Sequence, residues 1–144
     1  MVKSTAKMGY ELLDHTGDLG IRVWAEDVKG IFHEAARALF AIITDLEKVT
    51  VRVKRKIMVE AATIDELLVA WLSELLYLYE VEGLLFCDFA FTEIGEKSVT
   101  GIAMGEEFDE GRHAIRTSIK AATYHQLEMK EKDGRWHAQV IFDI

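Results

Sequence analysis

The sequence predicts an α+β domain in which two amphipathic helices pack on a largely antiparallel or mixed β-sheet. Two segments, residues 28–43 and 64–79, repeat their apolar residues at the three-and-four spacing of a helix. Most of the remaining chain alternates apolar and polar residues in short runs, as strands with one buried face do. The dipeptide Asp133-Gly134 between two such runs is a strong hairpin signal. We therefore expect one domain over residues 1–144, with a flexible or disordered N-terminus at 1–8.

The first part of the chain predicts two short strands, a helix and a third strand. Residues 10–14 and 19–25 each have the pattern of a strand, and the turn-like residues 15–18 separate them. Asp27 is a suitable N-cap for the following helix, because its carboxylate can accept a hydrogen bond from the first turn. Residues 49–61 then alternate over their whole length, which indicates a strand with one buried face.

The second helix has local signals at both ends. Thr63 and Glu66 form a capping box at its start. Gly83 is a suitable C-terminal stop, because glycine adopts the left-handed conformation without steric cost. The apolar stripe between them is expected to be core.

The remainder of the chain predicts β-structure interrupted by an acidic loop at residues 105–112. The strand-like runs are 84–93, 98–104, 116–132 and 135–144. A two-residue turn at Asp133-Gly134 pairs Lys132 with Arg135 and sets the register of the hairpin. Extended along the strands, that register places Tyr124 opposite Asp143, with Lys120 on the same face, and turns His125 toward the buried side.

Composition narrows the classes of function. The formal net charge is −8, which disfavours nucleic acid as a strong direct partner. A basic cluster on the expected strand 49–61, formed by Arg52, Lys54, Arg55 and Lys56, is interpreted as a solvated face, with RNA contact as the alternative. No apolar run reaches the length of a membrane span or a signal peptide. With the lone Cys87 expected to be a buried thiol, we expect a soluble cytoplasmic protein without membrane contact.

Acidic groups near the two ends of the sequence are the main candidates for a site. The carboxylates of Asp143 and Ile144 are both ionised at neutral pH and repel each other unless a cation lies nearby. Asp14 and Asp18 offer further oxygens. Such oxygens are hard ligands that suit Ca²⁺ or Mg²⁺. His15 lies between the two aspartates, but it lacks the second histidine or cysteine of a zinc site.

Several segments, taken together and in order, resemble the archease family. The segment YELLDHTGDLGI at 10–21 resembles the family's opening signature, HTAD followed by Ile or Val and Gly, with Gly17 in place of the usual alanine. The other matching segments are ELLYL at 74–78, EGLLF at 82–86, IKAATYH at 119–125 and WHAQVIFDI at 136–144.

The resemblance implies an accessory protein of the tRNA-splicing RNA ligase, which joins 2′,3′-cyclic phosphate and 5′-hydroxyl ends. Archeases are thought to promote guanylylation of the ligase's active-site histidine and its multiple turnover in tRNA splicing and RNA repair. They are not expected to catalyse ligation themselves. The family's metal site carries over to Asp18, Asp143 and Ile144, with Ca²⁺ the usual ion and Mg²⁺ or Mn²⁺ as alternatives. Lys120 matches a position implicated in activating the ligase.

Weaker candidates and two rival functions stay open. Asp14, His15 and Tyr124 are weaker site candidates, since Asp14 occupies a position that is often glutamate in relatives. A metal-dependent phosphoesterase or hydrolase could use the same carboxylates, although no general base is evident beside them. An RNA-binding chaperone would instead use the basic cluster.

Overall fold

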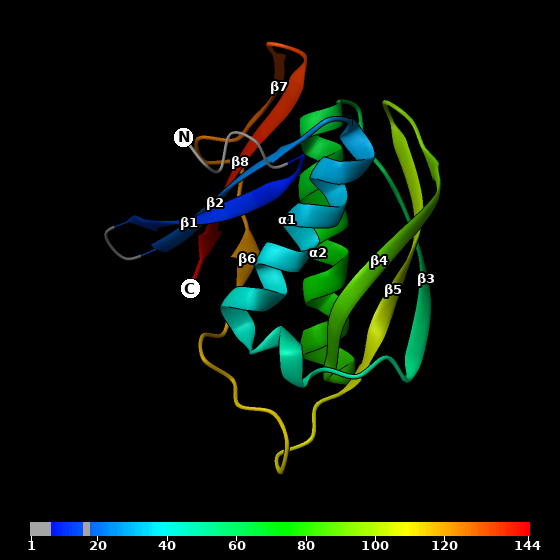
Figure 1. Cartoon of the computed structure of the whole chain (residues 1–144), viewed down its shortest axis with the longest axis vertical. Coiled ribbons are helices and arrows are strands. Elements are labelled where there is room, and N and C mark those ends of the chain that lie inside the picture. The colour runs from blue at the N-terminus through cyan, green and yellow to red at the C-terminus, as the bar shows by residue number, and fades with distance from the viewer. Residues whose placement is uncertain (1–6, 16–17) are drawn as a thin grey trace.

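The structure, a computed structural model, describes residues 7–15 and 18–144. The expected flexible segment 1–8 falls mostly outside the described residues. Figure 1 shows two helices lying between two antiparallel sheets. Helix α1 (Val28–Ile43) packs on strands of both sheets, and so does α2 (Ile64–Glu82). The predicted α+β class is confirmed, but the strands are divided between two sheets instead of forming one.

The first sheet has five strands in the order β1-β2-β8-β6, with β7 also paired to β8. Its strands are β1 (Gly9–His15), β2 (Asp18–Ala25), β6 (Ala121–Ala122), β7 (Glu128–Lys132) and β8 (Arg135–Asp143). The pairing of β2 with β8 joins the beginning of the chain to its end. Every pairing in this sheet is antiparallel.

The second sheet has three strands in the order β3-β5-β4. These are β3 (Val53–Glu60), β4 (Leu84–Ile94) and β5 (Ser98–Glu107). Strand β5 continues to Glu107, so the predicted acidic loop at 105–112 begins later than expected. The β4–β5 register shifts between Phe86 and Asp88, as at a β-bulge.

The local signals at the helix ends are confirmed. Asp27 Oδ1 accepts a hydrogen bond of 2.8 Å from the Gly30 amide, and Thr63 Oγ1 accepts one of 3.4 Å from the Glu66 amide. Gly83 ends α2 with φ of 68°. Between the caps, the apolar stripes of the two helices form the core, where Trp71 is fully buried and donates from Nε1 to the Phe32 carbonyl at 3.1 Å. None of the helices in the described residues is long and apolar enough to cross a membrane.

The predicted C-terminal hairpin is correct near its turn and wrong further along. Lys132 pairs with Arg135 as predicted, and the ladder continues to Glu128. The chain then leaves the ladder in a turn where Gln126 has φ of 52°. It rejoins β8 with Ala121, and not Tyr124, opposite Asp143. The predicted strand 116–132 is therefore two short strands, three residues out of register with each other.

That shift of register also overturns the prediction for His125. Its side chain is exposed, not buried. The reason is that it lies in the turn between β6 and β7, outside the ladder, so the alternation of faces along a strand does not apply to it.

Candidate functional site

The structure brings the second strand, β2, and the last strand, β8, together at the predicted acidic corner, defined here as Asp18, Asp143 and Ile144. Asp18 at the start of β2 is the direct antiparallel partner of Asp143 at the end of β8. Like charges directly opposite each other destabilise a strand pair, so this arrangement favours a cation nearby. Asp18 Oδ1 is shielded from solvent, whereas Asp143 is exposed. Figure 1 shows the C-terminus at this end of β8, close to β6.

Lys120 reaches the same corner by a route different from the predicted one. Its amide donates a hydrogen bond of 2.8 Å to the carbonyl of Asp143. The next residue, Ala121, pairs with Asp143 in the β6–β8 ladder. The proximity of Lys120 to the corner was therefore predicted correctly, but from a register that the structure does not contain. Its side chain is exposed and available to a partner.

The weaker candidates, Asp14, His15 and Tyr124, occupy different positions relative to the acidic corner. Asp14 is exposed and lies opposite Leu19, not opposite a second carboxylate. The backbone of His15 pairs with Asp18, but its side chain is not among those described. Tyr124 is 65% exposed and lies in the turn after β6, so its predicted place opposite Asp143 is wrong. Residues 16 and 17, part of the predicted acidic turn, lie outside the described residues.

The described residues do not contain a metal centre made of protein side chains alone. No group of three or more His, Cys, Asp or Glu side chains among residues 7–15 and 18–144 is arranged to hold a metal ion. The acidic corner provides only two such side chains, and its third predicted ligand is the main-chain carboxylate of Ile144. A cation there would take the rest of its ligands from main-chain oxygens, water or a partner.

The basic cluster is partly neutralised by its own chain. Arg52 Nε lies 3.3 Å from Glu106 Oε1, and Arg55 Nη1 lies 2.8 Å from Glu82 Oε1. Within the part of the chain that the structure describes, Lys54 and Lys56 form no ion pair. Two free lysines on an edge strand fit a solvated face that discourages edge pairing better than they fit a strong RNA site.

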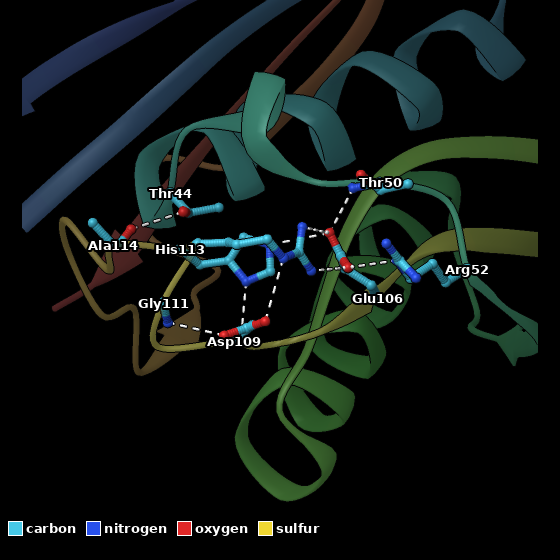
Figure 2. Close-up of polar contacts among 9 residues, drawn as sticks. Thr44, Thr50, Arg52, Glu106, Asp109, Gly111, His113 and Ala114 are labelled. Atoms are coloured by element: carbon cyan, nitrogen blue, oxygen red, sulfur yellow. Dashed lines mark hydrogen bonds and ion pairs between the residues drawn. The ribbon is translucent and has the colours of Figure 1, made fainter.

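A buried carboxylate at the end of β5 was missed by the sequence analysis. Glu106 is 2% exposed and receives hydrogen bonds from the Thr50 amide at 2.6 Å, from both Nη atoms of Arg112, and from His113 Nε2 at 3.1 Å. Together with the Arg52 contact, these residues form what we call the anchor network (Figure 2). The hydrogen bonds from Arg112, followed by those from Thr50 and His113, outweigh desolvation and lower the pKa of Glu106 to about 2.

A second cluster outside the corner surrounds His33 on α1. His33 Nδ1 lies 2.8 Å from Glu34 Oε2, and Nε2 lies 3.4 Å from Asp88 Oδ1. The hydrogen bond with Glu34 is the main reason that the pKa of His33 is raised, against the opposing effect of burial. The two carboxylates flank opposite sides of the ring, so they stabilise an imidazolium and do not converge on a common metal position.

Comparison with known proteins was consistent across sequence and structure. The sequence profile of the Archease protein family matches residues 10–144. The chain is 42% identical over 139 residues to protein archease of Methanosarcina mazei. The aligned region covers 94% of this chain and 95% of that protein. The chain is 39% identical over 140 residues to protein archease of Methanopyrus kandleri, which covers 95% of this chain and all of the relative.

Among solved structures, the solution structure of protein 1598 of Methanobacterium thermoautotrophicum has a TM-score of 0.81 and 33% identity. It covers 94% of this chain and 99% of its own. A crystal structure from Thermotoga maritima, described as an archease and possible chaperone, shares the fold with a TM-score of 0.58 and 19% identity. It covers 92% of this chain and 94% of its own. Both sequence and fold therefore place the chain in the archease family.

Proposed function

We propose that this protein activates the tRNA-splicing RNA ligase by promoting its guanylylation and multiple turnover, using the acidic corner and Lys120. Membership of the archease family supports this proposal, since activation of that ligase is what the resemblance implies. The direct opposition of Asp18 and Asp143, with the Lys120 amide bonded to the Asp143 carbonyl, is the observation that carries it. It joins residues far apart in the sequence at one end of the first sheet, where Lys120 and Asp143 are exposed.

The donor set of the corner fits a hard divalent cation such as Ca²⁺, with Mg²⁺ or Mn²⁺ as alternatives. Asp18, Asp143 and the main-chain carboxylate of Ile144 offer only oxygen atoms, which these ions prefer over softer ligands. A bound cation would neutralise the opposed carboxylates and could polarise a phosphate oxygen of a docked nucleotide site. Asp18 and Asp143 would hold it, and the Lys120 ammonium would add a second positive charge toward the partner.

The chain's own part in this mechanism is to present charge to another enzyme. Guanylyl transfer places negative charge on a phosphoryl group, and preorganised cationic groups stabilise such charge. The exposed positions of Asp143 and Lys120 allow them to approach the ligase's nucleotide site directly. On this proposal the protein is an activator and not itself the catalyst.

The test measures guanylylation and turnover of the purified ligase with and without this protein. Asp143→Asn and Lys120→Met should each remove most of the stimulation. Asp14→Asn is a matched control on the same sheet, because Asp14 lies opposite Leu19 instead of a carboxylate, and it should retain full stimulation. Equal stimulation by the wild type, Asp143→Asn and Lys120→Met would contradict the proposal.

Cation binding is tested separately by calorimetry with Ca²⁺. Asp18→Asn and Asp143→Asn should each weaken Ca²⁺ binding by on the order of tenfold, because each removes one anionic ligand. Asp14→Asn should bind like the wild type. The hydrolase alternative predicts a different result: turnover of a nucleotide or cyclic phosphate by this protein alone, lost in Asp18→Asn.

A further inference from the structure

The segment 108–120 carries the chain from the second sheet to the first without any helix or strand. It begins after the end of β5 and finishes at Lys120, beside the acidic corner. Irregular segments of this length are uncommon inside compact domains. Ordering each residue costs conformational entropy, and such a segment lacks the regular backbone hydrogen bonds of a helix or strand that would offset this cost. Its position must therefore be held by contacts along its length.

The anchor network fastens the beginning of this segment. Glu106 is the last buried residue before it and is bonded to Arg112 and His113, which lie within it. His113 Nδ1 accepts a hydrogen bond of 2.8 Å from the Asp109 amide, so Nε2 must carry the proton that it donates to Glu106. The His113 side chain is fully buried, and its bond to Glu106 has little competition from water.

Two further hydrogen bonds hold the segment beyond the anchor network. Thr44 Oγ1, just beyond the end of α1, donates to the Ala114 carbonyl at 2.8 Å, as Figure 2 shows. The Arg116 amide donates to the Ile43 carbonyl at 2.7 Å, which satisfies a carbonyl of the last turn of α1. Ile119, 1% exposed, then buries its side chain next to Lys120.

The strand that follows is too short to hold Lys120 by itself. Strand β6 consists of Ala121 and Ala122 only. On its far side Thr123 bonds the Ile141 carbonyl through its amide at 3.0 Å and its hydroxyl at 2.8 Å. Before β6 in the chain, the anchor network provides a contact that is both charged and buried.

We propose that Glu106 is a positioning residue: by anchoring segment 108–120 it holds Lys120 against the end of β8. The contacts of its carboxylate are with Thr50, Arg52, Arg112 and His113 and not with the acidic corner, so its effect on Lys120 runs through the segment. The consequence for the ligase rests on the function proposed above, whereas the consequence for the conformation of Lys120 does not.

Hydrogen exchange of individual amides tests the conformational part. Glu106→Gln keeps the size of the side chain but removes the buried charge that Arg112 pairs with, so the charge-assisted hydrogen bonds between the two side chains are lost. The Lys120 and Arg116 amides should exchange at least about tenfold faster, while amides of the β1–β2 ladder stay unchanged. Glu107→Gln is the matched control, since the adjacent Glu107 is exposed on the same strand.

A second variant keeps the test decisive if Glu106→Gln does not fold. Arg112→Gln removes the main partner of Glu106 from a side chain that is 40% exposed, so the core is undisturbed. It should accelerate the same two amides. Unchanged exchange at Lys120 in a folded Glu106→Gln or Arg112→Gln variant would overturn the proposal.

Ligase stimulation tests the functional part and separates the two proposals. If the anchor is lost, the productive placement of Lys120 becomes a minor population that the ligase can still select, so more protein is needed for the same maximum. Glu106→Gln should therefore raise the concentration for half-maximal stimulation, whereas Lys120→Met should lower the maximum itself. Normal half-maximal concentration despite fast exchange at Lys120 would refute the functional role of Glu106. Full stimulation by Lys120→Met would instead refute the proposed function and leave the exchange result standing.

Discussion

Gly105 on β5 lies where the second sheet leaves no room for a side chain. A Cβ atom on Gly105 would lie 1.8 Å from the carbonyl oxygen of Leu85 and 2.7 Å from the Cα atom of Phe86. Both are main-chain atoms of β4 and cannot rotate away, so the pairing of Phe86 with Gly105 would have to open. Gly105→Ala should therefore strongly destabilise the fold next to the anchor network.

Two other glycines provide a graded comparison. At Gly101 the added Cβ would lie 3.0 Å from Cη2 of Trp71, and at Gly95 its nearest neighbour would be 3.8 Å away. Because overpacking a core costs about 1–3 kcal/mol and a displaced backbone adds lost hydrogen bonds, Gly105→Ala should lower the free energy of unfolding by at least about 3 kcal/mol. Gly101→Ala should cost about 1–2 kcal/mol. Gly95→Ala should stay within about 0.5 kcal/mol of the wild type.

Urea denaturation followed by far-UV circular dichroism measures this series. The slope of unfolding free energy against urea should be similar in all variants, so that midpoints report stability. Failure of Gly105→Ala to fold would agree with the prediction, since the clash is with main-chain atoms. Equal midpoints for Gly105→Ala and Gly95→Ala would show that β4 and β5 do not approach as closely as described.

Three further predictions concern buried or partly buried polar groups. The pKa of Glu106 is lowered from 4.5 to about 2. Its charge therefore stabilises the fold fully above pH 4.5, and this stabilisation is lost as the pH falls from 4.5 toward 2. The difference in unfolding free energy between wild type and Glu106→Gln, measured by denaturation at several pH values, should shrink over the same pH range. The pKa of His33 is raised above 6.5, mainly by Glu34, so its contribution is fully present below 6.5 and lost as the pH rises through the folded pKa. A wild type to His33→Gln difference that stays constant with pH would contradict this. Trp71→Phe removes the 3.1 Å hydrogen bond to the Phe32 carbonyl and should cost about 1–3 kcal/mol in thermal or urea unfolding; no loss would mean that this bond has no net value.

Features encoded by neighbouring residues could be predicted from the sequence. The caps at Asp27 and Thr63 and the left-handed stop at Gly83 each depend on interactions within a few residues, so they were predicted correctly. The turn at Asp133-Gly134 likewise requires two positive φ angles, 56° and 73°, that these residue types tolerate. The hairpin next to it has the predicted register.

Predictions that extended a local pattern over many residues failed. The predicted register of the hairpin was extended as far as Tyr124. The ladder is interrupted before that residue, because Gln126 adopts a positive φ, which is not expected for glutamine. The division of the strands into two sheets was also not predicted, because alternation shows that a strand has a buried face but not which strand lies beside it.

The acidic corner also combines features that could be predicted from the sequence with features that could not. By itself the sequence determined that carboxylates near both chain ends were available, and the family resemblance selected Asp18 and Asp143 among them. Only the tertiary structure placed those two residues opposite each other, through the pairing of β2 with β8, and bonded the Lys120 amide to the Asp143 carbonyl. The anchor at Glu106 is likewise tertiary, since its partners come from segments on both sides of one helix and three strands. Local chemistry determines caps and turns because their partners are neighbours in the chain, whereas a site made by distant segments exists only after the sheets have paired and the helices have packed between them.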